Sequence, residues 1–303
     1  MKNKIVIIGC GNVGMSYAYA LLNQKIAVHE LVLIDLDKER IEGEVMDLNH
    51  CLAFAPTKME IKVGNYADCK DADIVCIAAG ANQKPGETRM DLINKNSKIF
   101  KDIIKNVVTT GFKGIFLVAT NPLDVMTYQT FKYSGFPSNK VIGSGTTLDT
   151  ARLRYIIGNK FKYNPKNIHA YVIGEHGDSE FIPWSNAIIG LNPIKDLIDD
   201  IEKESIYKEV KDSAYKIIDK KGATYYGIGM CLVYITNAIL NDLNSIITVS
   251  CYDKNNDIYI SYPAIINRNG IREILKMDLT EEEKNKLNNS IKAIKNAIIS
   301  LEE

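Results

Sequence analysis

The chain opens with the stretch KIVIIGCGNVG, residues 4–14, in which a short apolar run ends in three closely spaced glycines. The β-branched run predicts a buried strand, and the apolar spacing from the turn to Leu22 predicts a helix. A second apolar run, from Leu31 to Ile34, closes with Asp35. Strand, glycine-rich turn, helix, strand and acid in this order are typical of the first unit of a dinucleotide-binding fold.

Each part of this unit has a task in binding a dinucleotide. The turn, which brings the backbone close to a pyrophosphate at a helix N-terminus, consists of Gly9, Gly11, Asn12, Val13 and Gly14. Asp35 can accept hydrogen bonds from a ribose diol, and the neutral Leu36 after it supplies no counter-ion for a 2′-phosphate. The unit therefore predicts NAD and not NADP as the cofactor. A glycine-rich βα turn without a ligand is the alternative.

Further alternation of apolar runs and helical patterns predicts the fold class. Strands are expected at 59–63, 74–78, 115–119 and 141–142, with helices between them. Such a βα rhythm predicts an α/β fold built on a Rossmann, doubly wound parallel sheet. We therefore expect an NAD-binding Rossmann domain over residues 1–143.

The regular rhythm ends near Ser144, and a mixed α+β substrate domain is expected over residues 144–303. Its elements are a strand at 168–173, a charged helix at about 194–221 and an antiparallel hairpin at 246–262 around Asn255-Asn256. Thr280 and Glu283 have the spacing of a capping box that opens a last helix. Gly222, Ala223 and Thr224 interrupt the helical pattern after the charged helix.

Composition excludes several classes of function. Thirty-seven basic residues balance thirty-seven acidic ones, so nothing in the net charge favours nucleic acid or a membrane surface. No apolar run reaches the roughly 20 residues that span a bilayer, and no signal peptide is evident, so a cytoplasmic protein is expected. Six scattered cysteines lack the spacing of metal ligands, and no metal is expected.

Polar residues that follow the expected strands are candidates for a site, because the carboxyl ends of parallel strands line the ligand crevice. Residues 79–89, which include Ala79, Gly80, Gln83 and Arg89, form a polar loop that could be a lid or a plain surface connection. Asn121 follows another strand end and could face the crevice or cap a helix. Asp149 and Arg152 share one face of a helix, as a catalytic pair or as a surface ion pair.

His176 lies between Glu175 and Gly177 directly after an apolar run, where a strand end would present a proton donor. The chain has only four histidines, so few side chains are available for acid–base chemistry near neutral pH. A structural role is the alternative for a lone histidine.

Seven stretches together resemble the L-lactate dehydrogenases of the lactate and malate dehydrogenase family, nearly end to end: GCGNVG, AGANQKPGETR, ATNPLD, GSGTTLDTARLR, IGEHGD, KKGATYYGI and INRNGIRE. The resemblance implies NAD-dependent reduction of pyruvate to L-lactate, the last step of anaerobic glycolysis. Malate or another 2-hydroxy acid is the alternative substrate within the family.

The resemblance also implies roles for individual residues. His176 donates and accepts the proton, Asp149 orients its ring, and Arg152 clamps the substrate carboxylate through two hydrogen bonds. Arg89 polarises the carbonyl when the lid closes, and Asn121 and Thr224 contact substrate and nicotinamide groups. Asn121, Ala79 and Gly80 also belong to the implied cofactor site.

Substrate choice and regulation follow from further matches to the family. The neutral Gln83 would leave the second carboxylate of oxaloacetate buried without a cation, so pyruvate is predicted. Arg154 and His169 match positions that bind fructose 1,6-bisphosphate at a subunit interface, and the alternative is two ordinary basic residues near that interface. The resemblance also suggests a homotetramer.

Two rival interpretations belong to other classes. Short-chain dehydrogenases need Tyr-x-x-x-Lys, and Tyr207 and Lys211 have that spacing, although chance alone supplies one or two such pairs among 16 tyrosines. A non-catalytic NAD-binding sensor would need the glycine-rich turn and Asp35, but it would have no use for Asp149, Arg152 and His176 together.

Overall fold

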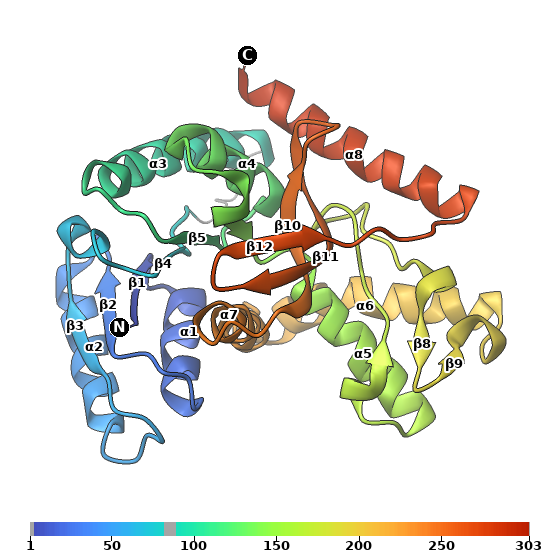
Figure 1. Cartoon of the computed structure of the whole chain (residues 1–303), viewed down its shortest axis with the longest axis horizontal. Coiled ribbons are helices and arrows are strands. Elements are labelled where there is room, and N and C mark those ends of the chain that lie inside the picture. Colours follow the sequence, from blue (N-terminus) through green and yellow to red (C-terminus); the bar gives the residue numbers. More distant parts are fainter. Residues whose placement is uncertain (1–2, 82–88, 303) are drawn as a thin grey trace.

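A computed structural model describes residues 3–81 and 89–302, without the side chains of residues 89–92 and 302. One nine-stranded sheet dominates the molecule, in the order β12-β11-β10-β6-β5-β4-β1-β2-β3 (Figure 1). The six strands that come first in the chain are mutually parallel: β1 (Lys4–Ile8), β2 (Glu30–Ile34), β3 (Glu60–Val63), β4 (Ile74–Ile77), β5 (Ile115–Val118) and β6 (Val141–Gly143). The order of these six is that of a Rossmann fold, which confirms the predicted class.

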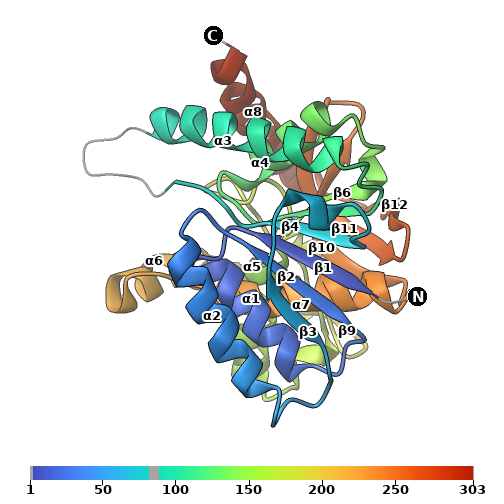
Figure 2. The same ribbon diagram turned by 90° about the vertical axis from the view of Figure 1, so that its left-hand side faces the viewer.

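Helices cover both faces of the sheet (Figures 1 and 2). One face carries α1 (Asn12–Asn23), α2 (Lys38–Cys51) and α7 (Tyr226–Leu240), and the other carries α3 (Arg89–Thr109), α4 (Leu123–Ser134) and α8 (Glu281–Glu302). Alternate residues of β1 supply the two cores: Ile5 and Ile7 pack with α1 and α7, whereas Val6 and Ile8 pack with α3 and α4. Both faces are apolar because both are covered.

The sheet does not end at the last parallel strand. β10 (Ser245–Asp253), β11 (Ile258–Asn267) and β12 (Gly270–Ile274) add an antiparallel extension, joined to β6 where Ser250 pairs with Gly143. The predicted hairpin is confirmed, with its turn between Asp253 and Ile258. The sheet therefore runs across the expected boundary near residue 143.

The remaining elements form a smaller layer with its own core. α5 (Thr147–Phe161) and α6 (Asp200–Lys221) pack against a three-stranded sheet of β7 (Ile168–His169), β8 (Ile188–Ile189) and β9 (Asn192–Pro193). Thr280 accepts from the Glu283 amide and Glu283 from the Thr280 amide, so the predicted capping box before α8 is confirmed. No helix among the residues described is both long and apolar enough to cross a bilayer.

Two element boundaries differ from prediction for identifiable reasons. The strand expected at 168–173 ends at His169, because side chains of α5 and of its N-cap residue then take the place of a partner strand: the Val172 amide donates to Thr150 Oγ1, and Val172 oxygen accepts from the N-cap Thr146 Oγ1. The helix expected from residue 194 begins at Asp200, where the Asp199 side chain accepts from the Glu202 amide and caps it.

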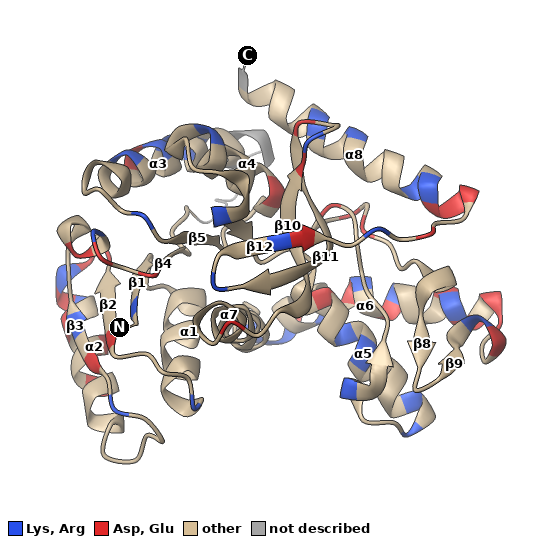
Figure 3. Ribbon diagram, viewed as in Figure 1, with Lys and Arg blue, Asp and Glu red and all other residues tan. Residues whose placement is uncertain are grey.

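Charged residues of both signs lie along the outer helices. Figure 3 shows basic and acidic residues interspersed along α6, whereas in α8 the acidic residues lie at the start of the helix and basic residues follow. This distribution agrees with the zero formal net charge of the sequence.

Candidate active site

Two glycines of the β1–α1 turn are required by close backbone packing. Gly9 has a φ of 91°, and a Cβ at this residue would lie 2.3 Å from the amide nitrogen of Ala79. A Cβ on Gly14 would lie 2.1 Å from the oxygen of Gly9. Only glycine allows the turn to pass this close to the end of β4 and to the start of α1.

Gly11 has a different role, because the space around its Cβ position is open to 4 Å among the described atoms. Gly11 is the N-cap of α1, and within the described part of the chain no side chain occupies that cap. The first-turn amides of α1 and the approach over Gly11 thus leave room for an anion at a helix N-terminus. The turn fits the pyrophosphate of a dinucleotide.

Asp35 ends β2 beside this turn, where Oδ2 accepts from the Cys10 amide at 2.7 Å and Oδ1 from the Asp37 amide at 3.1 Å. Burial opposes its ionisation, but these hydrogen bonds and the Arg40 guanidinium outweigh burial and lower the pKa of Asp35. The expectation that no cation lies beside Asp35 is wrong, because Arg40 Nη2 lies 3.2 Å from Asp35 Oδ2.

The ends of β4 and β5 form the adjoining wall of the crevice. A Cβ on Gly80 would lie 2.8 Å from Thr120 Cγ2, so these two strand ends are in contact. Asn96, which is 1% exposed, joins them: its Oδ1 accepts from the Ala81 amide at 2.8 Å, and its Nδ2 donates to Asn121 oxygen at 3.2 Å. Ala79, Gly80 and Asn121 are therefore held together beside the glycine-rich turn.

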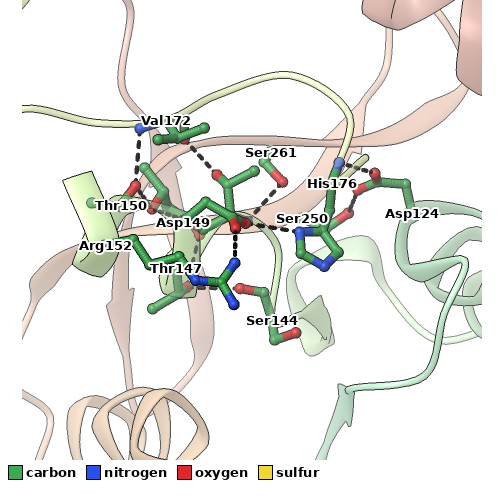
Figure 4. Close-up of polar contacts among 12 residues, drawn as sticks. Asp124, Ser144, Thr147, Asp149, Thr150, Arg152, Val172, His176, Ser250 and Ser261 are labelled. Carbon is green, nitrogen blue, oxygen red and sulfur yellow. Dashed lines mark hydrogen bonds and ion pairs between the residues drawn. The ribbon is translucent and has the colours of Figure 1, made fainter. Parts of the chain in front are cut away.

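His176, Asp149 and Arg152 converge as the sequence suggested (Figure 4). Asp149 Oδ2 lies 2.9 Å from His176 Nδ1, and Asp149 Oδ1 accepts from Arg152 Nη1 at 2.7 Å. The Asp149 side chain is 4% exposed, that of Arg152 13% and that of His176 26%, so the imidazole is the most accessible member. The pair on one face of α5 is thus not a surface ion pair.

Electrostatics in this cluster favour a protonated histidine. Burial alone would lower the pKa of His176, but the charge and hydrogen bond of Asp149, with smaller contributions from Glu180 and Asp124, raise it to about 9. Burial would raise the pKa of Asp149, and the imidazolium and Arg152 overcome that effect and lower it. The result is an imidazolium that faces an ionised carboxylate at neutral pH.

The His176 loop is a closed hairpin that three helices hold in place. Its two sides meet in the bridge between Ile173 and Phe181. Asp124 of α4 accepts from the His176 amide at 2.7 Å, Tyr207 of α6 donates to Glu180 oxygen at 2.8 Å, and Ser290 of α8 donates to Ser179 oxygen at 2.5 Å. The imidazole is therefore presented from a fixed backbone.

Several residues of this site were missed in the sequence. Asp124 is 3% exposed and also accepts from Ser250 Oγ at 2.5 Å, while burial raises its pKa to about 6. Glu180 is 5% exposed and lies in the same cluster as His176 and Asp149. Asp124 lies within the stretch ATNPLD, and Glu180 is the second acidic residue after His176, four residues beyond it. These positions in the sequence were the only features that could have marked Asp124 and Glu180 as site residues.

The other candidates lie at different distances from this cluster. Thr224 is half-buried in the connection from α6 to α7, whose Gly227 packs against Leu148 beside Asp149. Arg154 Nε donates to Ala170 oxygen at 3.1 Å, next to the exposed His169. Arg154 therefore contacts a different part of the structure from Arg152, which binds Asp149. Gln83 and the side chain of Arg89 lie outside the described residues.

Tyr207 and Lys211 are anchors of the histidine loop and not a catalytic pair. Tyr207 donates to Glu180 oxygen, and Lys211 Nζ donates to Asp178 oxygen at 3.0 Å. Both contacts are to backbone carbonyls of the loop. The short-chain dehydrogenase interpretation of their spacing is therefore wrong.

Comparison with known proteins agrees with the geometry. Residues 3–143 match the NAD binding domain of the lactate/malate dehydrogenase family, and residues 146–303 match its alpha/beta C-terminal domain. An L-lactate dehydrogenase of a Geobacillus species is 54% identical over 98% of this chain and 96% of its own length. L-lactate dehydrogenase 2 of Bacillus anthracis is 50% identical over 97% of this chain and 96% of its own length.

Solved structures give the same result. A lactate dehydrogenase from a Medee basin deep-sea metagenome library superposes with a TM-score of 0.97 at 50% identity, over the full length of both chains. The minor L-lactate dehydrogenase of Enterococcus mundtii, in a ligands-bound form, superposes with a TM-score of 0.96 at 42% identity, over 99% of this chain and 98% of its own.

Fold and site together define an NAD-dependent oxidoreductase. Within that class, the chain belongs to the lactate/malate dehydrogenase family.

Proposed function

We propose that this protein is an L-lactate dehydrogenase, which reversibly reduces pyruvate to L-lactate with NADH as the last step of anaerobic glycolysis. The observation that carries the proposal is the convergence of His176, Asp149 and Arg152 in one buried cluster. The relatives named L-lactate dehydrogenase, at 50% identity and above, support the same activity.

His176 supplies the proton for the keto oxygen. Its Nδ1 faces Asp149 Oδ2 at 2.9 Å, which fixes the ring so that Nε2 is free to face a substrate. In the direction of reduction the imidazolium donates from Nε2, and in the direction of oxidation the neutral ring accepts the proton. The bound nicotinamide would supply and recover the hydride at the adjacent carbon.

Arg152 holds the substrate carboxylate. A guanidinium has five N–H donors, and Arg152 directs one of them, on Nη1, to Asp149. Others can form two parallel hydrogen bonds with a carboxylate, which places the keto carbon at a fixed distance from His176. Asp149 thus positions both the acid and the clamp. We assign carbonyl polarisation to Arg89, and contacts with substrate and nicotinamide groups to Asn121 and Thr224.

Substrate choice is assigned to Gln83. A neutral side chain on the lid would leave the second carboxylate of oxaloacetate without a cation in a closed site, which is costly. The test is NADH oxidation with pyruvate, oxaloacetate and a branched 2-keto acid. Pyruvate is expected to have the highest kcat/KM, and a preference for oxaloacetate would overturn the assignment.

The role of His176 is tested by its replacement. His176→Ala is expected to lower kcat for pyruvate reduction by about 10²–10⁴-fold, the usual contribution of a general acid. The affinity for NADH, measured by fluorescence titration, should stay within about twofold of the parent. Near-native turnover in the variant would disprove the mechanism.

The two halves of the chain are assigned separate tasks: residues 1–143 bind the cofactor and residues 144–303 provide the acid and the carboxylate clamp. We also assign Arg154 and His169 to a fructose 1,6-bisphosphate site in a homotetramer, in which two cationic sets would face each other across a twofold axis. A pyruvate titration that is unchanged by the sugar bisphosphate would remove the effector, and sedimentation equilibrium measures the assembly.

A further inference from the structure

A third titratable side chain lies within the catalytic cluster. Ligand-type atoms of Asp149, His176 and Glu180 all lie within 4.8 Å of one another. Glu180 is 5% exposed, although it belongs to a loop that carries exposed residues such as Asp178. A buried carboxyl held this close to an imidazole acts on it electrostatically.

We propose that Glu180 is a positioning residue that acts through His176: as its buried carboxyl ionises with rising pH, its charge holds the proton on the imidazole that the reduction step needs. The inference rests on the proposed lactate dehydrogenase activity and adds a residue to its acid–base system. Asp149 orients the ring through a direct hydrogen bond, whereas Glu180 contributes charge from within the His176 loop itself.

The backbone around Glu180 fixes its distance from His176. Its amide donates to Gly177 oxygen at 3.3 Å, and its own oxygen accepts from Tyr207 at 2.8 Å. The next residue, Phe181, closes the hairpin against Ile173 through hydrogen bonds of 2.9 and 3.0 Å. His176 and Glu180 are therefore parts of one rigid loop, and the separation of their side chains does not depend on a hinge.

Charged groups from every neighbouring element act on this pair. α5 contributes Asp149 and Arg152, α4 contributes Asp124, and α6 contributes Lys211, while Glu175 of the loop acts on Asp124. Burial, with a smaller contribution from the charge of Asp149, raises the pKa of Glu180 to about 8, against the opposing charges of His176, Arg152 and Lys211. Glu180 therefore ionises over the same pH range in which His176 loses its proton.

Glu180 also borders a cavity outside the contacts of Asp149. The cavity has a volume of about 690 Å³ and is lined by Glu180 together with Tyr207, Lys203 and Glu283. Because Glu180 borders this cavity, we expect its carboxyl to respond to bulk pH. This arrangement lets bulk pH set the charge that His176 experiences.

The test is the pH dependence of kcat/KM for pyruvate in Glu180→Gln, Glu180→Asp and the parent protein. An opposite charge within ~4–6 Å shifts a pKa by about 1–3 units, and Glu180 is only partly ionised in this range. In Glu180→Gln, the fall of kcat/KM on the alkaline side of the pH profile, called here the alkaline limb, is therefore expected about one pH unit lower than in the parent. Glu180→Asp keeps the charge and should return the limb most of the way to the parent value.

Glu204→Gln is the matched control, because Glu204 lines the same cavity but is exposed. Its limb should coincide with that of the parent. A lower activity in Glu180→Gln with an unmoved limb would show a merely structural role and overturn the proposal.

A second readout does not need turnover. The imidazole of His176 can be titrated by NMR in the protein without substrate, with His176→Gln to assign its signal among the four histidines. The midpoint should fall in Glu180→Gln and stay constant in Glu204→Gln. If the parent protein fails to oxidise NADH with pyruvate, the proposed function fails, whereas an unmoved NMR midpoint contradicts the role of Glu180 alone.

Discussion

Asp124 Oδ2 accepts a hydrogen bond of 2.7 Å from the backbone amide of His176, across 52 residues of sequence. The contact joins the start of α4, which follows the end of β5, to the loop that carries the acid. A residue of the segment that matches the NAD binding domain thereby holds the backbone from which the imidazole extends.

Replacement of this acceptor is expected to weaken catalysis more than cofactor binding. Asp124→Ala leaves the His176 amide and Ser250 without their partner, and a hydrogen bond to a charged group contributes about 1.5–3 kcal/mol. We expect kcat for pyruvate to fall by about tenfold or more while the Kd for NADH stays within about twofold. Asp124→Asn retains an acceptor oxygen and should lose less. Equal turnover in Asp124→Ala and the parent would contradict the anchoring role.

The direction of the pH dependence follows from the raised pKa of His176. Pyruvate reduction needs the imidazolium, so kcat/KM should be level below the pKa and fall as the pH rises through about 9. Lactate oxidation needs the neutral ring and should rise through the same value. Initial rates in both directions between pH 6 and 10 check this. If the rates of pyruvate reduction and lactate oxidation both rose or both fell through this pH, His176 would be excluded as the titrating group.

The same shift also links folding to pH. A folded pKa above the unfolded value of 6.5 contributes stability that is fully present below pH 6.5 and is lost as the pH rises through about 9. The contribution should be absent in His176→Gln. Chemical denaturation at pH 6 and pH 9.5 compares the free energies of unfolding: the parent should lose more between the two than the variant does.

Arg152 is expected to resist conservative replacement. One N–H group of Arg152 donates to Asp149, and two further N–H groups are assigned to the substrate carboxylate. A lysine ammonium cannot present a planar pair of donors. Arg152→Lys should lower kcat/KM for pyruvate by about 10²-fold, which corresponds to about 2.7 kcal/mol at 1.36 kcal/mol per tenfold. Arg272→Lys, the same change at an exposed residue of β12, is the control and should leave kcat/KM unchanged.

The contact between Arg40 and Asp35 makes cofactor choice a balance of charges. Asp35 repels a 2′-phosphate, and its removal frees the Arg40 guanidinium that lies 3.2 Å away. Asp35→Ser is therefore expected to raise kcat/KM with NADPH by about tenfold and to lower it with NADH. The double replacement Asp35→Ser with Arg40→Ser should lose the gain with NADPH. A gain that persists in the double variant would show that Arg40 is not the group responsible.

Local signals in the sequence were sufficient for the cofactor half. The turn from Gly9 to Gly14 could be predicted because its glycine spacing, the strand before it and the helix after it lie in one short stretch of sequence, although the contact of Gly9 with Ala79 could not. The grouping of His176 with Asp149 and Arg152 was accessible from the family resemblance. These are the parts of the site that depend on short motifs.

Contacts between distant segments could not be predicted in the same way. Nothing in ATNPLD shows that Asp124 will meet a backbone amide 52 residues later, or that Arg40 will turn toward Asp35. The missing end of the strand before His176 has the same origin, because threonine side chains of α5 and of its N-cap residue satisfy the Val172 backbone that a neighbouring strand would otherwise bind. Local propensity cannot anticipate a competing side chain from another element.

The pairing of Gly143 with Ser250 constrains how this enzyme can be recombined with its relatives. A chimera joined at residue 143 would take its parallel strands from one parent and the strands that complete their edge from the other. A Cβ on Gly143 would lie 2.4 Å from Thr127 Oγ1 and 2.8 Å from Ser250 Cβ, so the seam tolerates no added bulk on either side. Functional exchange of cofactor halves therefore requires that β10 and α4 be inherited from the same parent as β6.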